Sequence, residues 1–432
     1  MKKCVLGDIC TKIGSGATPT GGRAAYAEEG VSLIRSQNVL DLTFSYGGLA
    51  YLNDSQADKL KSVAVQPNDV LLNITGDSVA RSCMVDEKVL PARVNQHVAI
   101  VRVKKEVANP YYIMLWLVWQ KKRLLLLASN GATRHALTKE MIEELPIDLP
   151  TLAEQSKIAL LLSTIDRKIA LNRKRIATLE AMAKEIYDYW FVQFDFPDAH
   201  GRPYKSSGGA MVYNPDLKRE IPKGWEVRPL ADAVKELNSG EWGSDACGES
   251  SSVQVHCLRG ADMEDQSHLP VRYISERKAD KLLNVGDIVI EMSGGSPTQA
   301  TGRSCYVSQG LLDAYNGKLT CTNFCNSLKL KELDETSYFF FVWRMFYRAG
   351  LMFNFEGKTS GLKNLQIDSL LTTKWVFPPK ELATKFNKLF LTSTAQTDNC
   401  KKEISRLSAL RDFLLPLLMN GQVKVGLSHG AG

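Results

Sequence analysis

The sequence predicts a mixed α/β (α+β) fold in which two related globular domains are separated by two long α-helices that pair as an antiparallel coiled coil. Three observations predict this fold. The 432-residue chain repeats itself at a shift of roughly 224 residues, each half holds short β-rich runs broken by turn signals, and each half ends in a long heptad-patterned segment. Two similar but diverged halves predict an internal pseudo-twofold repeat, and therefore a target with two related, non-identical halves.

Three stretches of each half carry the repeat. They align as 6–16 with 230–240, 31–41 with 255–265, and 68–85 with 286–307. The second pair keeps Arg35 opposite Arg259, and the third keeps an Arg-Ser-Cys triplet in which Arg81 aligns with Arg303. Each copy then ends in an apolar stretch closed by proline before its helical segment. The shared triplet allows a structural role for its arginines as well as a role in binding.

Turn signals such as GSG, TPTGG and SNGAT recur about every ten positions in the first half, with short strand-like runs between them. Within this half one helix is predicted over about 109–128, where an Asn-Pro pair favours a helix start. The segments predicted along the chain are a first globular domain at 1–149, a first helix at 150–192, a linker at 193–222, a second globular domain at 223–378, a second helix at 379–425 and a flexible tail at 426–432.

Apolar residues recur alternately three and four positions apart in both helical segments, which is the pattern of a coiled-coil seam. A helix of about 40 residues is about 60 Å long, because each residue adds about 1.5 Å. Asn172 interrupts the first seam and is predicted to set the register near Cys400, because the middle of the second seam is polar. The predicted seam consists of Ile158, Leu162, Ile165, Ile169, Asn172, Ile176, Leu179 and Ile186 in the first helix, and Phe386, Phe390, Ile404, Leu407, Leu414 and Leu418 in the second.

The composition is that of a soluble globular protein, with 44% hydrophobic and 23% charged residues and a net charge of +7. This balance permits nucleic-acid binding without requiring it, and the second globular segment is slightly acidic. Nine cysteines are scattered singly and the chain opens without an apolar signal core, so we expect a cytoplasmic protein. No apolar run approaches the length of a membrane span, so no membrane association is expected.

Motifs for catalysis or cofactor binding are missing from the sequence. The glycine-containing run at 293–304 lacks the spacing and the lysine of a phosphate-binding loop. Cys321 and Cys325 form the one close cysteine pair, and no histidine pair stands near them, so no metal site is predicted. We therefore predict a protein without catalytic residues and without a cofactor of its own.

The turn-rich loops of both halves are dense in Arg, Asn, Gln, Ser and Thr, the side chains that contact base edges and phosphates in DNA. These loops occur at corresponding places in the two copies, which favours a binding role over chance. The candidate DNA-binding residues are Ser15, Thr18, Thr20, Arg23, Arg35, Gln37, Asn38, Asn73, Thr75, Ser78, Arg81, Thr133, Arg134 and His135 in the first half, and Ser239, Trp242, Arg259, Ser293, Thr298, Gln299, Arg303, Lys358, Thr359, Ser360, Lys363 and Asn364 in the second.

Three stretches together resemble the DNA specificity subunits of type I restriction–modification systems. Residues 130–172, which include ELPIDLPTLAEQSKIALLLSTIDRKIALN, are similar to the family's join between recognition domain and spacer helix. Residues 185–230, beginning EIYDYWFVQFDFP, are similar to its central region, and residues 410–425 (LRDFLLPLLMNGQVKV) to its C-terminal end. The resemblance therefore spans nearly the whole chain.

The resemblance implies two target recognition domains, each binding one half of a split, asymmetric double-stranded DNA site, and a helical spacer that sets the distance between the halves. It implies a non-catalytic chain that docks two methyltransferase subunits and, with them, the restriction–translocation subunits. S-adenosylmethionine, ATP and Mg²⁺ would be bound by those partner subunits. The helices and the region around 180–230 would be the docking surface. The second helix departs from the first, since Leu382 and Ala383 replace the Glu154–Gln155 pair.

Three alternatives are less well supported by the residues. A methyltransferase or nuclease carrying its own reader would need a cofactor or metal motif. A structural coiled-coil protein whose repeated domains bind another ligand would not retard DNA in the presence of its partners. An orphan or phase-variable specificity subunit, exchanging recognition domains by recombination at the repeats, is compatible with the sequence.

Overall fold

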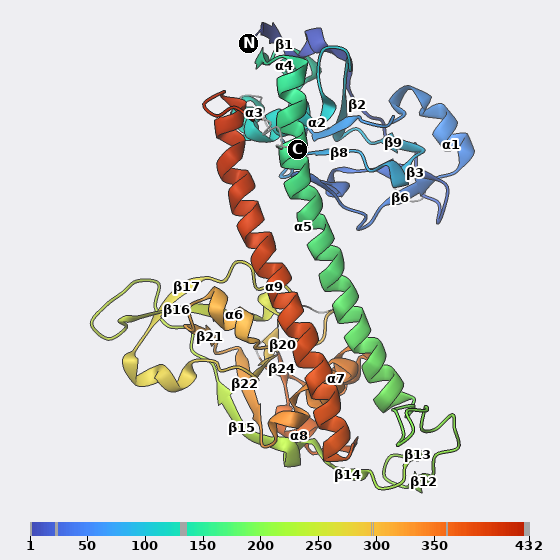
Figure 1. Ribbon diagram of the computed structural model, residues 1–432, viewed down its shortest axis with the longest axis vertical. Coiled ribbons are helices and arrows are strands. Elements are labelled where there is room, and N and C mark those ends of the chain that lie inside the picture. The colour runs from blue at the N-terminus through green and yellow to red at the C-terminus, as the bar shows by residue number, and fades with distance from the viewer. Residues whose placement is uncertain are drawn as a thin grey trace, which may run out of the picture. The chain divides into compact units, whose positions relative to one another are not determined.

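The computed structural model describes residues 2–21, 25–129, 136–294, 296, 298–359 and 362–426. The chain folds into two compact units, each built from a globular part and from segments of both long helices. The first unit comprises Met1–Ala170 with Ser405–Gly432, and the second comprises Leu171–Ile404. Figure 1 labels the elements of both units. No helix of the described residues is long and apolar enough to cross a membrane.

The described residues of the globular part of the first unit form small sheets and four short α-helices. Its helices are α1 (Asp54–Lys59), α2 (Pro110–Trp119), α3 (Lys121–Ser129) and α4 (Lys139–Glu143). Its strands are β1 (Lys2–Val5), β2 (Cys10–Ser15), β3 (Val31–Ile34), β4 (Val39–Leu40), β5 (Thr43–Phe44), β6 (Ala50–Leu52), β7 (Val70–Asn73), β8 (Ser82–Met84), β9 (Ala92–Val94), β10 (Val98–Val103) and β11 (Pro146–Leu149).

The globular part of the second unit has the same texture. Its helices are α6 (Gln309–Ala314), α7 (Thr336–Arg348) and α8 (Ile367–Leu371). Its strands are β12 (Met211–Asn214), β13 (Arg219–Pro222), β14 (Glu226–Pro229), β15 (Val234–Ser239), β16 (Val253–Leu258), β17 (Val271–Ile274), β18 (Ile288–Glu291), β19 (Ser293–Gly294), β20 (Ser304–Tyr306), β21 (Leu319–Cys321), β22 (Cys325–Leu330), β23 (Glu356–Thr359), β24 (Leu362–Leu365) and β25 (Lys374–Phe377).

The internal repeat is visible in the order of the strands. The four-stranded sheet β2-β10-β7-β8 of the first unit corresponds to β15-β22-β18-β20 of the second. The three-stranded sheet β6-β3-β9 corresponds to β17-β16-β21, and in both of these sheets the last pair is parallel. The pair β1-β11 corresponds to β14-β25. This agreement of strand order confirms the mixed fold and the internal repeat that the sequence predicts.

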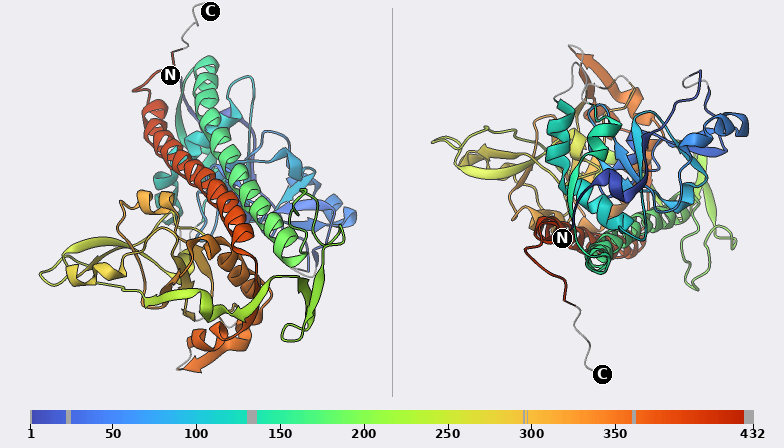
Figure 2. Two further views of the ribbon diagram at one scale, coloured as in Figure 1. Left: turned by 60° about the horizontal axis from the view of Figure 1, so that its bottom comes forward. Right: turned by 90° about the horizontal axis from the view of Figure 1, so that it is seen from above.

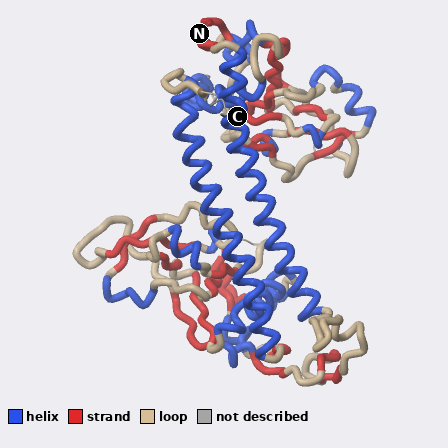
Figure 3. Tube along the Cα trace, in the orientation of Figure 1, coloured by secondary structure: helices blue, strands red, loops and turns tan. Residues whose placement is uncertain are grey.

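Two long helices complete both units, α5 (Leu152–Tyr187) and α9 (Lys380–Met419). Figure 3 shows them as the longest helical segments of the chain. In the second unit they run antiparallel, since Asn172, Arg175 and Leu179 contact Glu403, Gln396 and Ser393 in turn. In the first unit Arg411 of α9 pairs with Asp166 of α5, the Nη1–Oδ1 distance being 2.9 Å. Figure 2 shows the two helices side by side in a further view. The antiparallel coiled coil is therefore present in each unit.

The predicted seam is buried most completely in its first half. Ile158, Leu162, Ile165 and Ile169 are buried, as are Phe386, Phe390 and Leu418 near the two ends of α9. The remaining predicted seam residues are half-buried, namely Ile176, Leu179, Ile186, Ile404, Leu407 and Leu414. The buried polar residues Thr397 and Cys400 occupy the middle of α9. Residues in the polar middle of α9 are thus buried even though several apolar seam residues around them are only half-buried.

The register contact at Asn172 differs from the one that the sequence predicts. Asn172 is 3% exposed, and its Nδ2 donates to Glu403 Oε2 at 2.7 Å. Cys400, the expected neighbour, lies almost one helical turn away on α9 and is itself buried. A carboxylate can accept the amide N–H more strongly than a thiol can, so the contact falls on Glu403.

Near Ile186 the inward face of α5 is wider than one heptad row. Ile186 and Trp190 are half-buried and pack against the core that contains Phe386, whereas Tyr187 and Phe191 are 2% and 3% exposed. Residues Asp188–Val192 form a π-helical turn directly after Tyr187. Tyr187 and Phe191 belong to an aromatic core with Phe341 of α7 and Phe386 of α9.

Two further sequence predictions are corrected. The helix predicted over about 109–128 is interrupted at Gln120, whose backbone has a ψ of 4°, and so consists of α2 and α3. The segment 193–222, predicted as a linker, is folded into the second unit as the hairpin β12–β13. Its Phe194 and Ile221 are buried, and Arg219 lies over the Phe194 ring at 4.6 Å. The predicted tail lies almost entirely outside the described residues.

Gln155 joins α5 to the globular part of the first unit. It is fully buried, its Oε1 accepts from Asn109 N at 2.9 Å, and its Nε2 donates to Pro150 O at 3.0 Å. The neighbouring Glu154 caps the start of the helix by accepting from the backbone and side chain of Thr151. In α9 the corresponding residues are apolar, and Leu382 and Ala383 are both buried. Glu154 and Gln155 therefore cap α5 and hold it to the globular part of the first unit.

We expect Phe386→Ala to lower the free energy of unfolding of the second unit by roughly 3–5 kcal/mol, the usual cost of removing a buried phenylalanine. Phe386 is 1% exposed and its ring lies 5.0 Å from that of Phe191. The measurement is the thermal or urea unfolding transition of the purified chain. Leu389→Ala on the same helix is the control, because Leu389 is 45% exposed. Equal losses in the two variants would contradict a core role for Phe386.

We expect Asn172→Ala to lower the unfolding free energy by roughly 1.5–3 kcal/mol, since it removes a hydrogen bond to a carboxylate and leaves that carboxylate beside an apolar seam. Asn399→Ala, an exposed asparagine of α9, is the matched control. Urea unfolding of both variants checks the prediction. A variant at position 172 as stable as the control would show that the Asn172–Glu403 contact does not stabilise the pair.

Candidate nucleic-acid interface

The predicted loops of the first unit converge on one end of the sheet β2-β10-β7-β8. Gly16 N donates to Val98 O at 3.0 Å, which joins the end of β2 to the start of β10. Ile74 N donates to His97 O at 3.0 Å, and Thr75 Oγ1 lies 2.6 Å from His97 Nδ1, which adds the end of β7. The antiparallel pairing of these strands thus brings together loops that are distant in the sequence.

The candidate residues of the first unit differ in how far they reach the surface. Ser15, Thr18, Thr20 and Gln37 are exposed. Arg35, Thr75, Ser78 and Arg81 are half-buried, and Asn38 and Asn73 are fully buried. Arg23, Thr133, Arg134 and His135 lie outside the described residues. The exposed hydroxyl and amide groups, with the two arginines, are the groups of this unit that a DNA groove could meet.

The two buried asparagines hold the loops from inside. Asn38 Oδ1 accepts from Arg35 N at 2.9 Å, and its Nδ2 donates to Ser45 O at 2.9 Å. Asn73 Nδ2 donates to Ser36 O and Val39 O at 2.9 and 3.2 Å, which fixes the 36–39 segment against the end of β7. These amides satisfy backbone groups that would otherwise be buried without partners. In this conformation they shape the surface and do not lie on it.

Arg35 is oriented by neutral groups. Its Nη2 donates to Gly48 O, and its Cζ lies 5.4 Å from the centre of the Tyr26 ring. Arg81 makes no side-chain hydrogen bond or ion pair within the residues that the structure describes. Among the described residues, the first unit therefore presents two guanidinium groups, those of Arg35 and Arg81, that are not paired with a carboxylate.

The second unit repeats the arrangement at the end of β15-β22-β18-β20. Gly240 N donates to Cys325 O at 2.9 Å, and Met292 N donates to Phe324 O at 2.8 Å. Ser293 pairs with Asn364 of β24, their Oγ and Oδ1 atoms being 2.5 Å apart, so a further small sheet is added here. The predicted loops of this half thus also converge on one sheet end.

Several candidates of the second unit are tied to neighbours. Trp242 stacks with Arg272, whose Cζ lies 4.1 Å from the ring centre, and Gln299 Nε2 donates to Tyr347 Oη at 3.2 Å. Lys363 pairs with Glu356 at 3.1 Å. Ser239, Arg259, Thr298 and Gln299 are exposed, and Trp242, Ser293, Arg303, Lys363 and Asn364 are half-buried. Lys358 and Thr359 contribute backbone to β23 without described side chains, and Ser360 lies outside the described residues.

Both repeated arginines of the second unit are paired with carboxylates. Arg259 contacts Asp262 through Nε and Nη2, each at 2.8 Å, and Arg303 contacts Glu291 through Nε at 2.9 Å and Nη2 at 2.6 Å. Hydrogen bonding to Asp262 raises the pKa of Arg259, and bonding to Glu291 likewise raises the pKa of Arg303. The second unit therefore carries two bidentate ion pairs where the first unit carries unneutralised arginines.

Asp262 and Glu291 are the site residues that the sequence reasoning missed. They align with Asn38 and Asn73, so both amides of the first half become carboxylates in the second. The signal was present in the repeat, because two amide-to-acid replacements beside two retained arginines would add two ion pairs.

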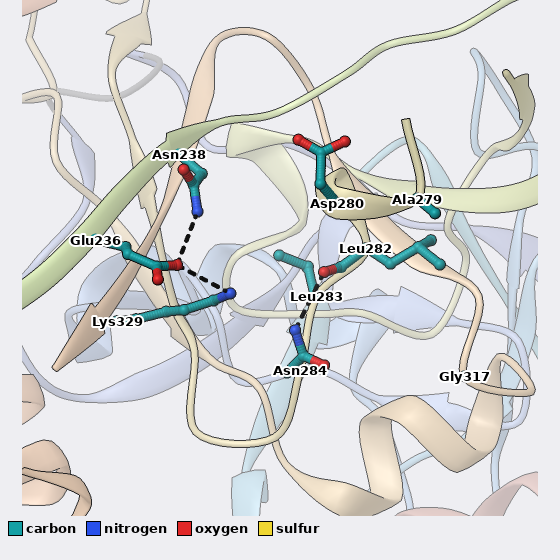
Figure 4. Close-up of a pocket in the computed structure, with 9 residues that line it drawn as sticks. All are labelled: Glu236, Asn238, Ala279, Asp280, Leu282, Leu283, Asn284, Gly317 and Lys329. Atoms are coloured by element: carbon teal, nitrogen blue, oxygen red, sulfur yellow. Dashed lines mark hydrogen bonds and ion pairs between the residues drawn. The ribbon is translucent and has the colours of Figure 1, made fainter. Parts of the chain in front are cut away.

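A polar cavity of about 490 Å³ lies beside β15 in the second unit (Figure 4). Across it Lys329 Nζ lies 3.4 Å from Glu236 Oε2, which also accepts from Asn238 Nδ2 at 3.4 Å. The first unit has a counterpart of about 340 Å³ that includes Arg102, the residue aligned with Lys329. No predicted site residue lines either cavity, so they are separate from the candidate interface.

Each unit has a buried aspartate near its cavity, and the two aspartates have different hydrogen-bond partners. Asp69 is fully buried and receives Arg102 Nε and Nη2, each at 2.7 Å. Its counterpart Asp287 is 3% exposed and accepts from Asn284 N at 2.9 Å, while Lys329 pairs with Glu236 instead. Burial raises the pKa of Asp287. A raised carboxyl pKa means that the charged form is disfavoured in the folded state, so this residue opposes folding at neutral pH. This opposition lessens as pH falls through the folded pKa and is gone below the pKa of the unfolded chain.

We therefore expect opposite results from one substitution at the two positions. Asp69→Asn should lower the unfolding free energy by roughly 3 kcal/mol at pH 7, because it leaves Arg102 without its partner. Asp287→Asn should leave the unfolding free energy unchanged or raise it, and should remove the gain in stability that acidification gives at this residue. Urea unfolding at several pH values checks both. A large loss at neutral pH in the variant at position 287 would contradict the raised pKa.

Comparisons with known proteins show which proteins this chain is similar to. Residues 1–181 match the family described as "Type I restriction modification DNA specificity domain". The MjaIX specificity subunit of a type I restriction enzyme from Methanocaldococcus jannaschii is 28% identical over 340 residues, covering 78% of this chain and 74% of that protein. The HindI specificity subunit from Haemophilus influenzae is 20% identical over 442 residues, covering 91% of this chain and 94% of that protein.

A solved structure agrees with these relatives at the level of the fold. The S subunit of a type I restriction–modification system from M. genitalium superposes with a TM-score of 0.58 at 15% identity, covering 96% of this chain and 95% of that one. Residues 1–181 are thus similar to the DNA specificity domain of type I restriction–modification systems, and the relatives above are specificity subunits of such systems. The resemblance found in the sequence is thereby confirmed.

Proposed function

We propose that this chain is the sequence-reading subunit of a type I restriction–modification complex and recognises a bipartite, asymmetric double-stranded DNA site. The observation that carries the proposal is the presence of two corresponding loop clusters, one at the same sheet end of each unit, with different side chains in the two copies. Two related but different reading surfaces fit two different half-sites. Base edges in a groove are read by the side chains that these loops supply.

The paired helices support a second part of the proposal, in which they set the spacing between the half-sites. The length of a rigid helical pair is fixed by its number of residues. Such a pair would hold two DNA-binding domains at a fixed distance and so set the number of base pairs between the half-sites. The buried seam of α5 and α9 and the Asn172–Glu403 contact would keep that distance fixed. Sliding of one helix along the other would break this contact and change the spacing.

The proposal assigns catalysis to partners. Two methyltransferase subunits, with restriction–translocation subunits, would dock on the chain and bind S-adenosylmethionine, ATP and Mg²⁺, while this chain binds no cofactor. The exposed apolar side chains on the helices support a docking role there. They include Leu160, Leu171, Met182, Leu389, Leu410 and Phe413, of which Phe413 is 66% exposed. Solvent-facing apolar residues in such number on two helices favour a protein partner.

The test is methylation-sensitive sequencing of DNA from cells that hold the cognate methyltransferase subunit with or without this chain. We expect a split, adenine-methylated motif only when the chain is present. Replacing residues 1–149 with the corresponding domain of another family member should change one half of that motif and leave the other half and the spacing intact. Co-purification of the complex is the control for assembly. An assembled complex that methylates no motif, or an exchange that alters both halves, would refute the proposal.

A further inference from the structure

We propose that Arg259, held in place by Asp262, is a specificity-determining residue of the second unit and that it binds the edge of a guanine base. This inference rests on the proposed function and adds to it a residue and a base. It is carried by the geometry of the Arg259 guanidinium, by the loop that supports it, and by the contrast with Arg35.

The ion pair leaves one edge of the guanidinium available. Arg259 uses Nε and one N–H of Nη2 on the two oxygens of Asp262. The remaining edge, formed by Nη1 and the second N–H of Nη2, still holds two parallel donors. Guanine O6 and N7 are two parallel acceptors in the major groove, and arginine pairs with them through such an edge. The Arg259 side chain is 46% exposed and that of Asp262 is 9% exposed, so the arginine is at the surface and its support is beneath it.

The loop beneath Arg259 is fixed. Arg259 N donates to Asp262 Oδ2 at 2.9 Å, and Asp262 N donates back to Arg259 O at 2.9 Å. A Cβ at Gly260 would stand 2.6 Å from Glu291 Oε1, so a larger residue there would require the Glu291 side chain or the loop to shift. Glu291 in turn pairs with Arg303, whose side chain is 22% exposed. Of the two repeated arginines, Arg303 thus belongs to the base of the site and Arg259 to its surface.

The first unit shows what the carboxylate adds. Asn38 occupies the place of Asp262 and accepts from Arg35 N at the same 2.9 Å, so the turn of the loop does not need a charge. The guanidinium of Arg35 instead contacts Gly48 O and the Tyr26 ring. The distinct effect of Asp262 is therefore to orient the Arg259 guanidinium and to reduce its net charge. A neutralised, oriented arginine suits an uncharged base edge better than a phosphate.

Two variants separate orientation from charge. Asp262→Asn keeps the cap that Asn38 makes naturally in the first unit and releases the guanidinium, and Arg259→Lys keeps the positive charge without the two-donor edge. Arg277→Ala is the matched control. Arg277 is exposed and lies three residues after Ile274. Ile274 pairs with Val253, the first residue of β16, whereas Arg259 follows the last residue of that strand. Each variant is expressed with the cognate methyltransferase subunit, and its methylated motif is read by methylation-sensitive sequencing.

We expect both site variants to relax the preference for one G·C pair in a single half-site by roughly tenfold or more, the size of one lost bidentate base contact. The other half-site and the spacing should match those of the wild-type chain, and the Arg277→Ala motif should be unchanged. Complexes that assemble and methylate the unaltered motif in both site variants would overturn the assignment of Arg259 while leaving the proposed function intact. Relaxation at an A·T pair would overturn the choice of guanine. A wild-type chain that yields no motif would refute the proposed function itself.

Discussion

The structure depends on the burial of a long apolar seam. A helix of 36 residues and one of 40 cannot leave their apolar rows in water, and each covers the other within both compact units. The globular parts then attach to the helices by different means. In the first unit a buried glutamine bonds to backbone groups, whereas in the second an aromatic core of Tyr187, Phe191, Phe341 and Phe386 encloses the helix ends. The long helices are thus attached to the globular part by polar hydrogen bonds in the first unit and by aromatic packing in the second.

Sequence reasoning succeeded where the pattern was long and periodic. The heptad rows predicted both helices and most of the buried seam, and the repeat predicted two copies of one strand order. It did not reveal the π-helical turn at Asp188–Val192, because no apolar spacing reports such a turn. It was wrong for 193–222, where proline, glycine and serine suggested a linker but Phe194 and Ile221 are core residues.

The candidate interface was predictable in its loops and less so in its side chains. Asn38 and Asn73 have the composition of base-reading residues, yet they are fully buried and bond to backbone. Amide side chains serve both purposes equally well, so composition alone does not separate a loop's support from its surface. The carboxylates Asp262 and Glu291 were overlooked for the converse reason, since acidic residues are not expected near DNA. Their role becomes visible only when the arginine beside each is considered.

The joint at Gln155 has a consequence for how such a chain can change over generations. Its partners are the backbone N–H of Asn109 and the backbone carbonyls of Pro150 and Val107. Backbone groups are common to every amino acid sequence, so this glutamine does not require any particular side chain on the domain that it holds. The globular domain of the first unit can therefore diverge in almost all of its surface and still pack on the same helix. The attachment does not depend on the side chains of the globular domain. Those side chains can therefore change under selection without any change in the helix that holds the domain.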